Sequence, residues 1–257
     1  MTGATGGLGR AIAAALAEHG ATMILSSRKA DALVNLGESL PGEGHRAHVA
    51  DLAADGAAER LAADAGRVDV LVANAGLPAS GALDDFSPEE VARAVRVNLE
   101  APMRLARAVI EQMVERGEGH FVFMSSLAGK APTPRSSVYN ATKFGLRGFA
   151  LGLRSDLAGT GVGVSVILPG FVREAGMFAD SGAKPPAGMG TTTPQEVADA
   201  VVRAILHDRH EVAVAPLRQR AAAHLALASP GIVVRVNSGG GARRSAESVA
   251  RGQAGKR

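Results

Sequence analysis

Short apolar runs alternate along the chain with longer segments in which apolar residues recur at helical spacing. The runs are rich in Val, Ile, Leu and Ala, as in strands that are buried on both faces. They cover residues 21–27, 46–50, 68–76, 120–126, 162–170 and 211–216. The helical spacing covers residues 8–19, 88–115, 138–157 and 194–207. Because strand, helix and strand repeat in this order, the pattern predicts right-handed βαβ units, and therefore one α/β domain with a doubly wound parallel sheet between two layers of helices.

Two of the predicted helices carry N-terminal signals. Ser87 and Thr193 each precede a proline, and a carboxylate follows in the first turn. The hydroxyl can accept from a free backbone amide, proline suits the first helical position, and the carboxylate interacts favourably with the helix dipole. We therefore expect helices to begin at Pro88 and Pro194.

Polar residues or glycines follow five of the apolar runs, and a glycine-rich loop opens the chain. Ligands of a doubly wound sheet bind outside the carboxyl ends of its strands, so these positions are the candidates for a binding site. They are residues 3–9, Ser27, Arg28, Asp51, Leu52, Asn74, Ala75, Gly76, Ser125, Ser126, Pro169 and Gly170.

Composition narrows the class of protein. The 257 residues include no Cys and no Trp, and only 3% are aromatic, so the core must be aliphatic. The absence of Cys excludes a disulfide framework and a thiolate metal site, and we expect no metal centre. No apolar run approaches the roughly 20 residues that span a bilayer, and no signal-peptide pattern opens the chain. These features favour a cytoplasmic protein.

Positive charge is concentrated at the C-terminus. Residues 237–257 hold five basic residues and one acid, whereas the net charge of the whole chain is +3. This composition predicts a disordered, solvated tail, with a nucleic-acid contact as the less favoured interpretation. Residues 217–236 are expected to form a helical extension. The Ala-rich apolar face of its helix, residues 217–228, is too small for firm membrane attachment.

The opening loop, MTGATGGLGR, has the spacing of a phosphate-binding turn. Gly3 would permit the turn, Gly7 would let a pyrophosphate approach backbone amides, and Gly9 would let the following helix pack closely on the sheet. Ordinary tight turns can show the same pattern, so it needs support from other motifs.

Tyr139 and Lys143 are four residues apart and share one face of a predicted helix. An ammonium group near a phenol favours the phenolate and lowers the phenol pKa from its reference of about 10. Tyr139 would then exchange a proton near neutrality. A surface pair on an amphipathic helix is the alternative, but Tyr139 is the only tyrosine of the chain. Ser126 ends a predicted strand, where its hydroxyl could bond the oxygen of a carbonyl substrate.

Together the motifs resemble, in order and spacing, the short-chain dehydrogenase/reductase family over about residues 2–216. They are TGATGGLG at 2–9, ANAG at 73–76, VNL at 97–99, SS at 125–126, the Tyr139 and Lys143 pair, and Pro169-Gly170. The resemblance implies that residues 1–216 are an NADP-binding, Rossmann-like catalytic domain. It also implies an oxidoreductase that transfers a hydride between the nicotinamide and a carbonyl or secondary alcohol.

The resemblance assigns four catalytic residues. Tyr139 would be the general acid or base, and Ser126 would bond the substrate oxygen. Lys143 would hold the nicotinamide ribose and depress the Tyr139 pKa. Asn98 would kink its helix and hold a water that links Lys143 to solvent.

The cofactor-binding residues implied by the resemblance lie at the strand ends. They are Gly3, Thr5, Gly7, Leu8, Gly9, Ser27, Arg28, Asp51, Leu52, Asn74, Ala75, Gly76, Tyr139, Lys143, Pro169, Gly170 and Val172. Asp51 would meet the adenine ring, and Asn74 would stabilise the end of its strand. Ser27 and Arg28 stand where an NAD enzyme usually has an acid, and they suit the 2′-phosphate of NADP. An ordinary exposed arginine is the alternative.

The chain departs from the family pattern at two places. Many members have a Thr a few residues after Pro-Gly that bonds the nicotinamide carboxamide, whereas this chain reads PGFVREAGMF, so the backbone at Val172 is the expected substitute. The strand that normally precedes the glycine loop has no counterpart before Thr2. We therefore expect the natural product to carry further N-terminal residues with a strand of about five or six. The alternative is that the chain starts at Met1 and either is unstable or fills the gap by another route.

Substrate and assembly are less defined. Residues 171–193, the lid segment, are rich in Gly, Pro and small residues, and Met177, Phe178 and Met189 could face a moderately apolar substrate or pack the segment onto the body. A non-catalytic dinucleotide-binding sensor or scaffold is the alternative function. The resemblance implies a homodimer or homotetramer through the long helices that contain Asn98 and Tyr139.

Overall fold

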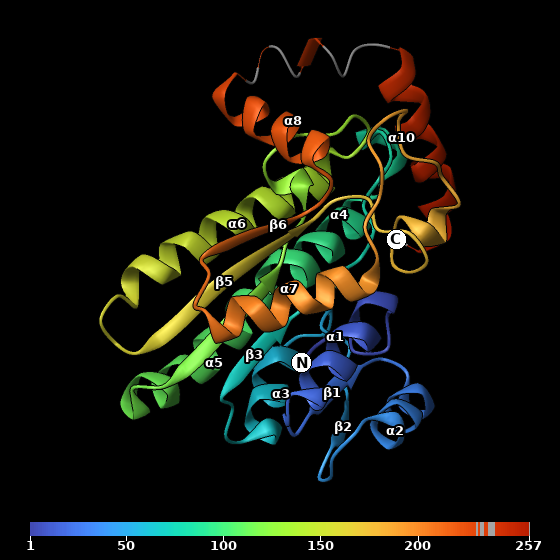
Figure 1. The fold of residues 1–257 in the computed structure, drawn as a ribbon. Helices are drawn as coiled ribbons and strands as arrows, with labels where there is room; N and C mark the ends of the chain where they lie inside the picture. The colour runs from blue at the N-terminus through green and yellow to red at the C-terminus, as the bar shows by residue number, and fades with distance from the viewer. Residues whose placement is uncertain (230, 232–233, 236–239, 257) are drawn as a thin grey trace.

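The computed structural model describes residues 1–229, 231, 234–235 and 240–256 (Figure 1). Its helices and strands alternate along most of the chain. They are α1 (Gly7–Glu18), β1 (Ile24–Ser27), α2 (Ala30–Ser39), β2 (Arg46–Val49), α3 (Ala57–Ala65), β3 (Val70–Ala73), α4 (Pro88–Val95), a π-helical turn (Arg96–Glu100), α5 (Ala101–Arg116), β4 (Gly119–Met124), α6 (Ser137–Asp156), β5 (Val162–Pro169), α7 (Pro194–Leu206), β6 (Glu211–Val214), α8 (Leu217–Ala228) and α10 (Gly240–Gln253).

The sheet is parallel throughout, as the βαβ pattern predicted. β1 pairs with β2, and β3, β4, β5 and β6 form a second, four-stranded group in that order. All six strands lie within the predicted runs or within one residue of them, and both faces carry helices. The doubly wound α/β fold is therefore confirmed. The helices α2 and α3 were not predicted.

Residues 1 and 2 occupy the place between the two strand groups. The Thr2 amide donates to the Val72 oxygen of β3 at 3.0 Å, and the Ser26 amide of β1 donates to the Met1 oxygen at 2.9 Å. A single bridge, from Thr2 to Ser26, represents the strand that the family pattern places here. The terminal ammonium of Met1 donates to the Ile24 oxygen at 2.7 Å, and burial lowers its pKa to about 5.

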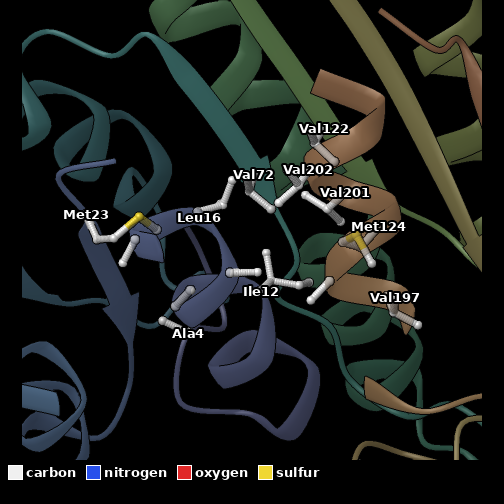
Figure 2. Packing of buried hydrophobic residues seen from close by; sticks show 14 of the residues in the cluster. Ala4, Ile12, Leu16, Met23, Val72, Val122, Met124, Val197, Val201 and Val202 are labelled. Atoms are coloured by element: carbon white, nitrogen blue, oxygen red, sulfur yellow. The ribbon is translucent and has the colours of Figure 1, made fainter. Parts of the chain in front are cut away.

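Two apolar clusters cover the faces of the sheet. On one face, Ile12 of α1 and Val201 of α7 pack against Val72 and Val122 of the sheet (Figure 2). On the other face, the apolar sides of α3, α5 and α6 pack against Phe121 and its strand neighbours. Successive residues of β4 thus point into different clusters, as period-two strands buried on both faces require.

The predicted helix starts at Pro88 and Pro194 are confirmed. The Ser87 hydroxyl accepts from the Glu90 amide at 3.2 Å, and the Glu90 carboxylate accepts in return from the Ser87 amide at 2.9 Å. Thr193 and Glu196 form the same reciprocal pair. Each cap satisfies two of the amides that a helix N-terminus leaves free.

The C-terminal residues differ from the expected disordered tail. Residues 237–239 and 257 lie outside the described residues, but 240–253 form α10, which packs on the lid segment (Figure 1). The Gln253 side chain is buried and donates to the Met177 oxygen at 2.9 Å. Composition could not reveal this contact, because it joins residues 76 positions apart. The helix predicted for residues 217–228 is α8, with those bounds.

Candidate active site

The glycine loop is held against the end of β3. The Thr2 hydroxyl accepts from the Asn74 and Ala75 amides, both at 3.1 Å. The Asn74 side-chain amide donates to the Thr2 and Gly3 oxygens at 3.2 and 3.1 Å. Asn74 therefore ties the loop to this strand end, where the resemblance had placed a stabilising role. No sequence signal pointed to the part that Thr2 plays.

The loop has room only for glycine at its critical positions. Gly3 has φ of +63°, and a Cβ there would lie 2.8 Å from the Ala75 Cα. A Cβ at Gly9 would overlap the Gly3 oxygen, so α1 approaches the turn as closely as predicted. The helix begins at Gly7 after Gly6, which supplies no side-chain cap, and its first turn holds no acid. The backbone amides of this first turn have no side-chain partner, and they suit an anionic group such as a pyrophosphate.

Tyr139 and Lys143 face the end of β4 from α6. The Lys143 Nζ lies 5.6 Å from the centroid of the Tyr139 ring and donates to the Met124 oxygen at 2.9 Å. The Ser126 hydroxyl bonds the phenol of Tyr139 and accepts from the Ala128 amide at 3.1 Å. Ser125 supports the same corner, because its hydroxyl donates to the Lys143 backbone oxygen at 2.9 Å.

The expected lowering of the Tyr139 pKa does not hold in this structure. Burial raises the pKa of Tyr139, and the hydrogen bond with Ser126 opposes this shift only in part. Burial also lowers the pKa of Lys143 to about 8. The Lys143 ammonium is directed at the Met124 oxygen, so desolvation of the phenol outweighs the attraction that the spacing suggested.

Asn98 lies at the centre of the π-helical turn and is fully buried. Its Oδ1 accepts from the Leu77 amide at 2.6 Å, and its Nδ2 donates to the Leu77 oxygen at 2.9 Å. The turn is the helix distortion that the resemblance implied at this position. A Cβ at Gly76 would lie 3.4 Å from the Asn98 Oδ1 and 3.9 Å from the Lys143 Nζ, so both side chains converge next to Gly76.

The predicted adenosine-side residues follow β1 and β2. The Ser27 hydroxyl accepts from the Lys29 amide at 3.2 Å, and Arg28 is exposed. Asp51 accepts from the Ala53 amide at 3.0 Å and lies 3.6 Å from the Arg93 guanidinium. Leu52, the neighbouring candidate, is buried. The structure thus leaves Arg28 in solvent at the end of β1, the position where the sequence predicted a 2′-phosphate.

Residues 169–172 lead from β5 into the lid segment. The Pro169 oxygen lies 3.5 Å from the Ser126 hydroxyl, and the Gly170 amide donates to the Val214 oxygen at 3.0 Å. Val172 forms a parallel bridge with Thr192. The bonds of this bridge use backbone groups of residues 171 and 173, which directs the N–H and C=O of Val172 to the opposite side. That orientation suits the carboxamide contact expected of Val172.

The lid segment covers the glycine loop. Ala175 lies against the position that a Cβ at Gly7 would take, and the Met177 Cε lies 3.2 Å from the corresponding position at Gly76. Leu8 faces Gly176 of the lid segment, and the Thr5 oxygen accepts from the Arg10 guanidinium at 3.2 Å. The glycine loop suits a dinucleotide, and the lid segment lies against the same loop.

Comparisons with known proteins agree with this geometry. Residues 1–186 match the family model described as short chain dehydrogenase. A protein of Nostoc sp. named Ketoacyl reductase HetN is 38% identical over 220 residues, which are 83% of this chain and 77% of that protein. The closed form of serine dehydrogenase complexed with NADP+ superposes with a TM-score of 0.75 at 30% identity, covering 84% of this chain and 94% of the other. A short-chain dehydrogenase from Sphingobium yanoikuyae in complex with NADPH gives a TM-score of 0.78 at 27% identity, over 91% and 93% of the two chains.

Proposed function

Since the chain belongs to the short-chain dehydrogenase family and is an oxidoreductase, we propose that it reduces a carbonyl compound with NADPH. One observation carries the proposal. Ser126 after β4, Tyr139 and Lys143 of α6, and Asn98 of the π-helical turn come from three different segments. Tyr139 lies next to Ser126 and Lys143, and Lys143 and Asn98 converge beside Gly76, near a glycine loop that suits a phosphate. A non-catalytic sensor would not need this complete set.

The pKa shifts favour the reductive direction. Bound NADPH supplies the hydride that reaches the carbonyl carbon. Because burial raises the pKa of Tyr139, its phenol stays protonated near neutral pH and can donate a proton to the carbonyl oxygen. Ser126 bonds the same oxygen. Lys143, with a pKa of about 8, holds the ribose and can return a proton toward the phenol.

Arg28 supports the choice of NADP. It is exposed at the end of β1, and a guanidinium pairs well with a phosphate dianion. The NADP complexes of related structures point the same way. The test compares the catalytic efficiency with NADPH and with NADH. Equal or better use of NADH would refute this assignment.

A β-ketoacyl compound is the proposed substrate class. The similarity to a protein named ketoacyl reductase supports a 3-oxo group, and the lid segment offers an apolar wall for an acyl chain. The rings of Phe171 and Phe178 pack in this wall with centroids 4.7 Å apart. Serine dehydrogenase, a structural neighbour, is named for a 3-hydroxy acid, so oxidation of such acids is the second activity to assay.

The experiment follows NADPH absorbance with ethyl acetoacetate and a panel of longer 3-oxo esters, and then assays 3-hydroxy acids with NADP+. We expect consumption of NADPH with the esters. Tight NADPH binding without turnover of any substrate in the panel would instead support the sensor or scaffold.

We also propose a homodimer or homotetramer formed through α5 and α6. A surface groove of about 500 Å³ runs along these helices and is lined by Val95, Leu99, Met103 and Phe149 with three charged residues. Met103 in this groove and Phe144 elsewhere on α6 are both more than a third exposed. A second copy would cover this apolar surface.

A further inference from the structure

A buried glutamine of α8 joins the two ends of the lid segment. Gln219 is 6% exposed, and Ala223 and Ala226 are the other residues of α8 that are buried. The Oε1 of Gln219 accepts from the Phe171 amide at 3.2 Å, at the start of the lid segment. Its Nε2 donates to the Met189 and Gly190 oxygens, both at 3.0 Å, near the end of the segment. All the hydrogen bonds found for this side chain therefore go to lid backbone.

The surroundings of Gln219 are shaped around this contact. A Cβ at Gly170 would collide with the Gln219 Oε1, so the backbone comes close to the amide only because residue 170 is glycine. Gly190 has φ of +68°, and a Cβ there would lie 3.1 Å from the Pro216 ring. The bridge between Val172 and Thr192 joins the two ends of the lid segment, which we call its base, next to the side chain of Gln219.

We propose that Gln219 is a positioning residue that holds both ends of the lid segment and so sets where its tip lies over the active site. This inference rests on the proposed function. The base is one residue from Pro169-Gly170, so a shift of Phe171 moves the backbone at the active-site end of β5. It also moves the Phe178 ring that packs on Phe171.

The tip is the part of the lid segment that reaches the active site. Met177 lies beside Gly76, where Asn98 and Lys143 also converge. The second contact on the tip is the Gln253 side chain of α10, which bonds the Met177 oxygen. With the base held by α8 and the tip by α10, two C-terminal helices determine the shape of the apolar wall. Neither helix lies in residues 1–186, which match the family model.

The bonding pattern requires an amide. A glutamine side chain offers one acceptor for Phe171 and two donors for the oxygens of Met189 and Gly190. An ionised glutamate keeps the acceptor but places negative charge against two carbonyl oxygens. A protonated glutamic acid keeps the acceptor and regains one donor. Methionine has a similar length and supplies neither an N–H donor nor an oxygen acceptor.

The first test measures opening of the lid segment by limited trypsin digestion. Arg173 is exposed within the segment, and Arg67 is exposed in the loop before β3, so cleavage after Arg67 reports opening elsewhere. We expect Gln219→Met and Gln219→Glu at about pH 8 to raise the ratio of the two cleavage rates about tenfold. Arg220→Met, on an exposed position of the same helix, is the control and should leave the ratio unchanged. An unchanged ratio in both Gln219 variants would overturn the proposal.

The second test is kinetic and uses NADPH with ethyl acetoacetate. We expect Gln219→Glu at about pH 8 to raise KM about tenfold while kcat changes less than threefold, because the groups that transfer the proton are untouched. Between about pH 8 and about pH 5.5 its KM, relative to that of the wild type, should fall as the carboxyl gains its proton. A relative KM that does not depend on pH, or an equal loss in kcat, would contradict a positioning role.

If Gln219→Met fails to fold, the cleavage ratio and the KM of Gln219→Glu alone test the proposal. The digestion does not require turnover. If the wild type reduces no carbonyl compound, the proposed function fails, and the trypsin ratio still supports or overturns the role of Gln219 in holding the lid segment.

Discussion

At the scale of single residues, Tyr139 contributes one oxygen to the proposed reaction, and phenylalanine removes only that oxygen. We expect Tyr139→Phe to lower kcat by about 10²- to 10⁴-fold, because the proton donor is lost while the ring and the fold remain. NADPH binding, measured by fluorescence titration, should change less than about threefold, since the glycine loop and Arg28 are untouched. Retention of most of the activity would exclude Tyr139 as the proton donor.

His120 gives the fold a pH dependence of its own. Burial lowers its pKa to about 4, and its ring bonds the Ser165 hydroxyl at 2.8 Å. That hydroxyl donates to the Arg209 oxygen at 2.6 Å, so the ring supplies the proton of its bond to Ser165. The native ring is thus neutral at pH values where an unfolded chain, with a His pKa of about 6.5, already binds a proton.

As the pH is lowered from about 6.5 to about 4, the free energy of unfolding should therefore decrease. His120 contributes at most about 1.4 kcal/mol to this decrease per pH unit. Urea denaturation at several pH values measures the slope. In His120→Gln the contribution should vanish, whereas His224→Gln, at an exposed position, should keep it. A slope that is the same in both variants would contradict this account.

The difference between the Tyr139 motif and its electrostatics shows what single residues reveal in a sequence. Spacing alone predicted that Tyr139 and Lys143 share a helix face, and the structure agrees. The direction of the Tyr139 pKa depends on burial and on where the ammonium points. Neither property follows from a spacing of four residues.

At the scale of elements, the predictions held where a local signal existed. The capped helices α4 and α7 begin where proline and the hydroxyl caps predicted. Apart from α10, which lies where composition predicted a disordered tail, two helices were missed. α2 and α3 are short, at 10 and 9 residues, and neither has a side-chain cap bond. They are helical because their apolar sides pack on the sheet, and such tertiary contacts leave only a weak pattern in a short segment.

β1 and β3 are joined through residues 1 and 2, by the bridge between Thr2 and Ser26 and by the hydrogen bond from the Thr2 amide to the Val72 oxygen. An engineered N-terminal extension of about five Val- and Ile-rich residues should pair with both strands. It also replaces the buried terminal amino group of Met1, whose pKa burial lowers to about 5, by a peptide amide. We expect a gain of about 3 kcal/mol, and therefore of about 6 to 12 °C in Tm.

The matched control is an extension of equal length rich in Pro and Gly, which cannot pair in a central position. Differential scanning calorimetry compares the two extended forms with the original chain. Equal Tm values for the two extensions would show that pairing between β1 and β3 does not limit stability.

At the scale of the whole molecule, the sequence indicated the edge of the sheet that carries the candidate site and a lid segment beside it, but not the contacts that hold the lid segment. Residues at the carboxyl ends of successive strands meet at one edge by the geometry of a parallel sheet, so local motifs suffice to place them. The lid contacts of Gln219 and Gln253 join residues 48 and 76 positions apart. Only the folded chain brings these side chains to the lid segment.

The assembly of several copies is the remaining question at this scale, and the groove along α5 offers a direct test. Met103 is 39% exposed beside Leu99 and Phe149, so a second copy would bury it, whereas a monomer would leave it in water. A stable dimer needs about 1,200 to 2,000 Å² of buried surface, and a lysine at its apolar centre would lose its hydration. We expect Met103→Lys to convert the oligomer to a monomer in sedimentation analysis. Leu206→Lys, which changes another exposed apolar residue on α7, should keep the wild-type mass. A monomeric wild type, or a Met103→Lys variant that still forms the oligomer, would place the interface elsewhere or exclude it.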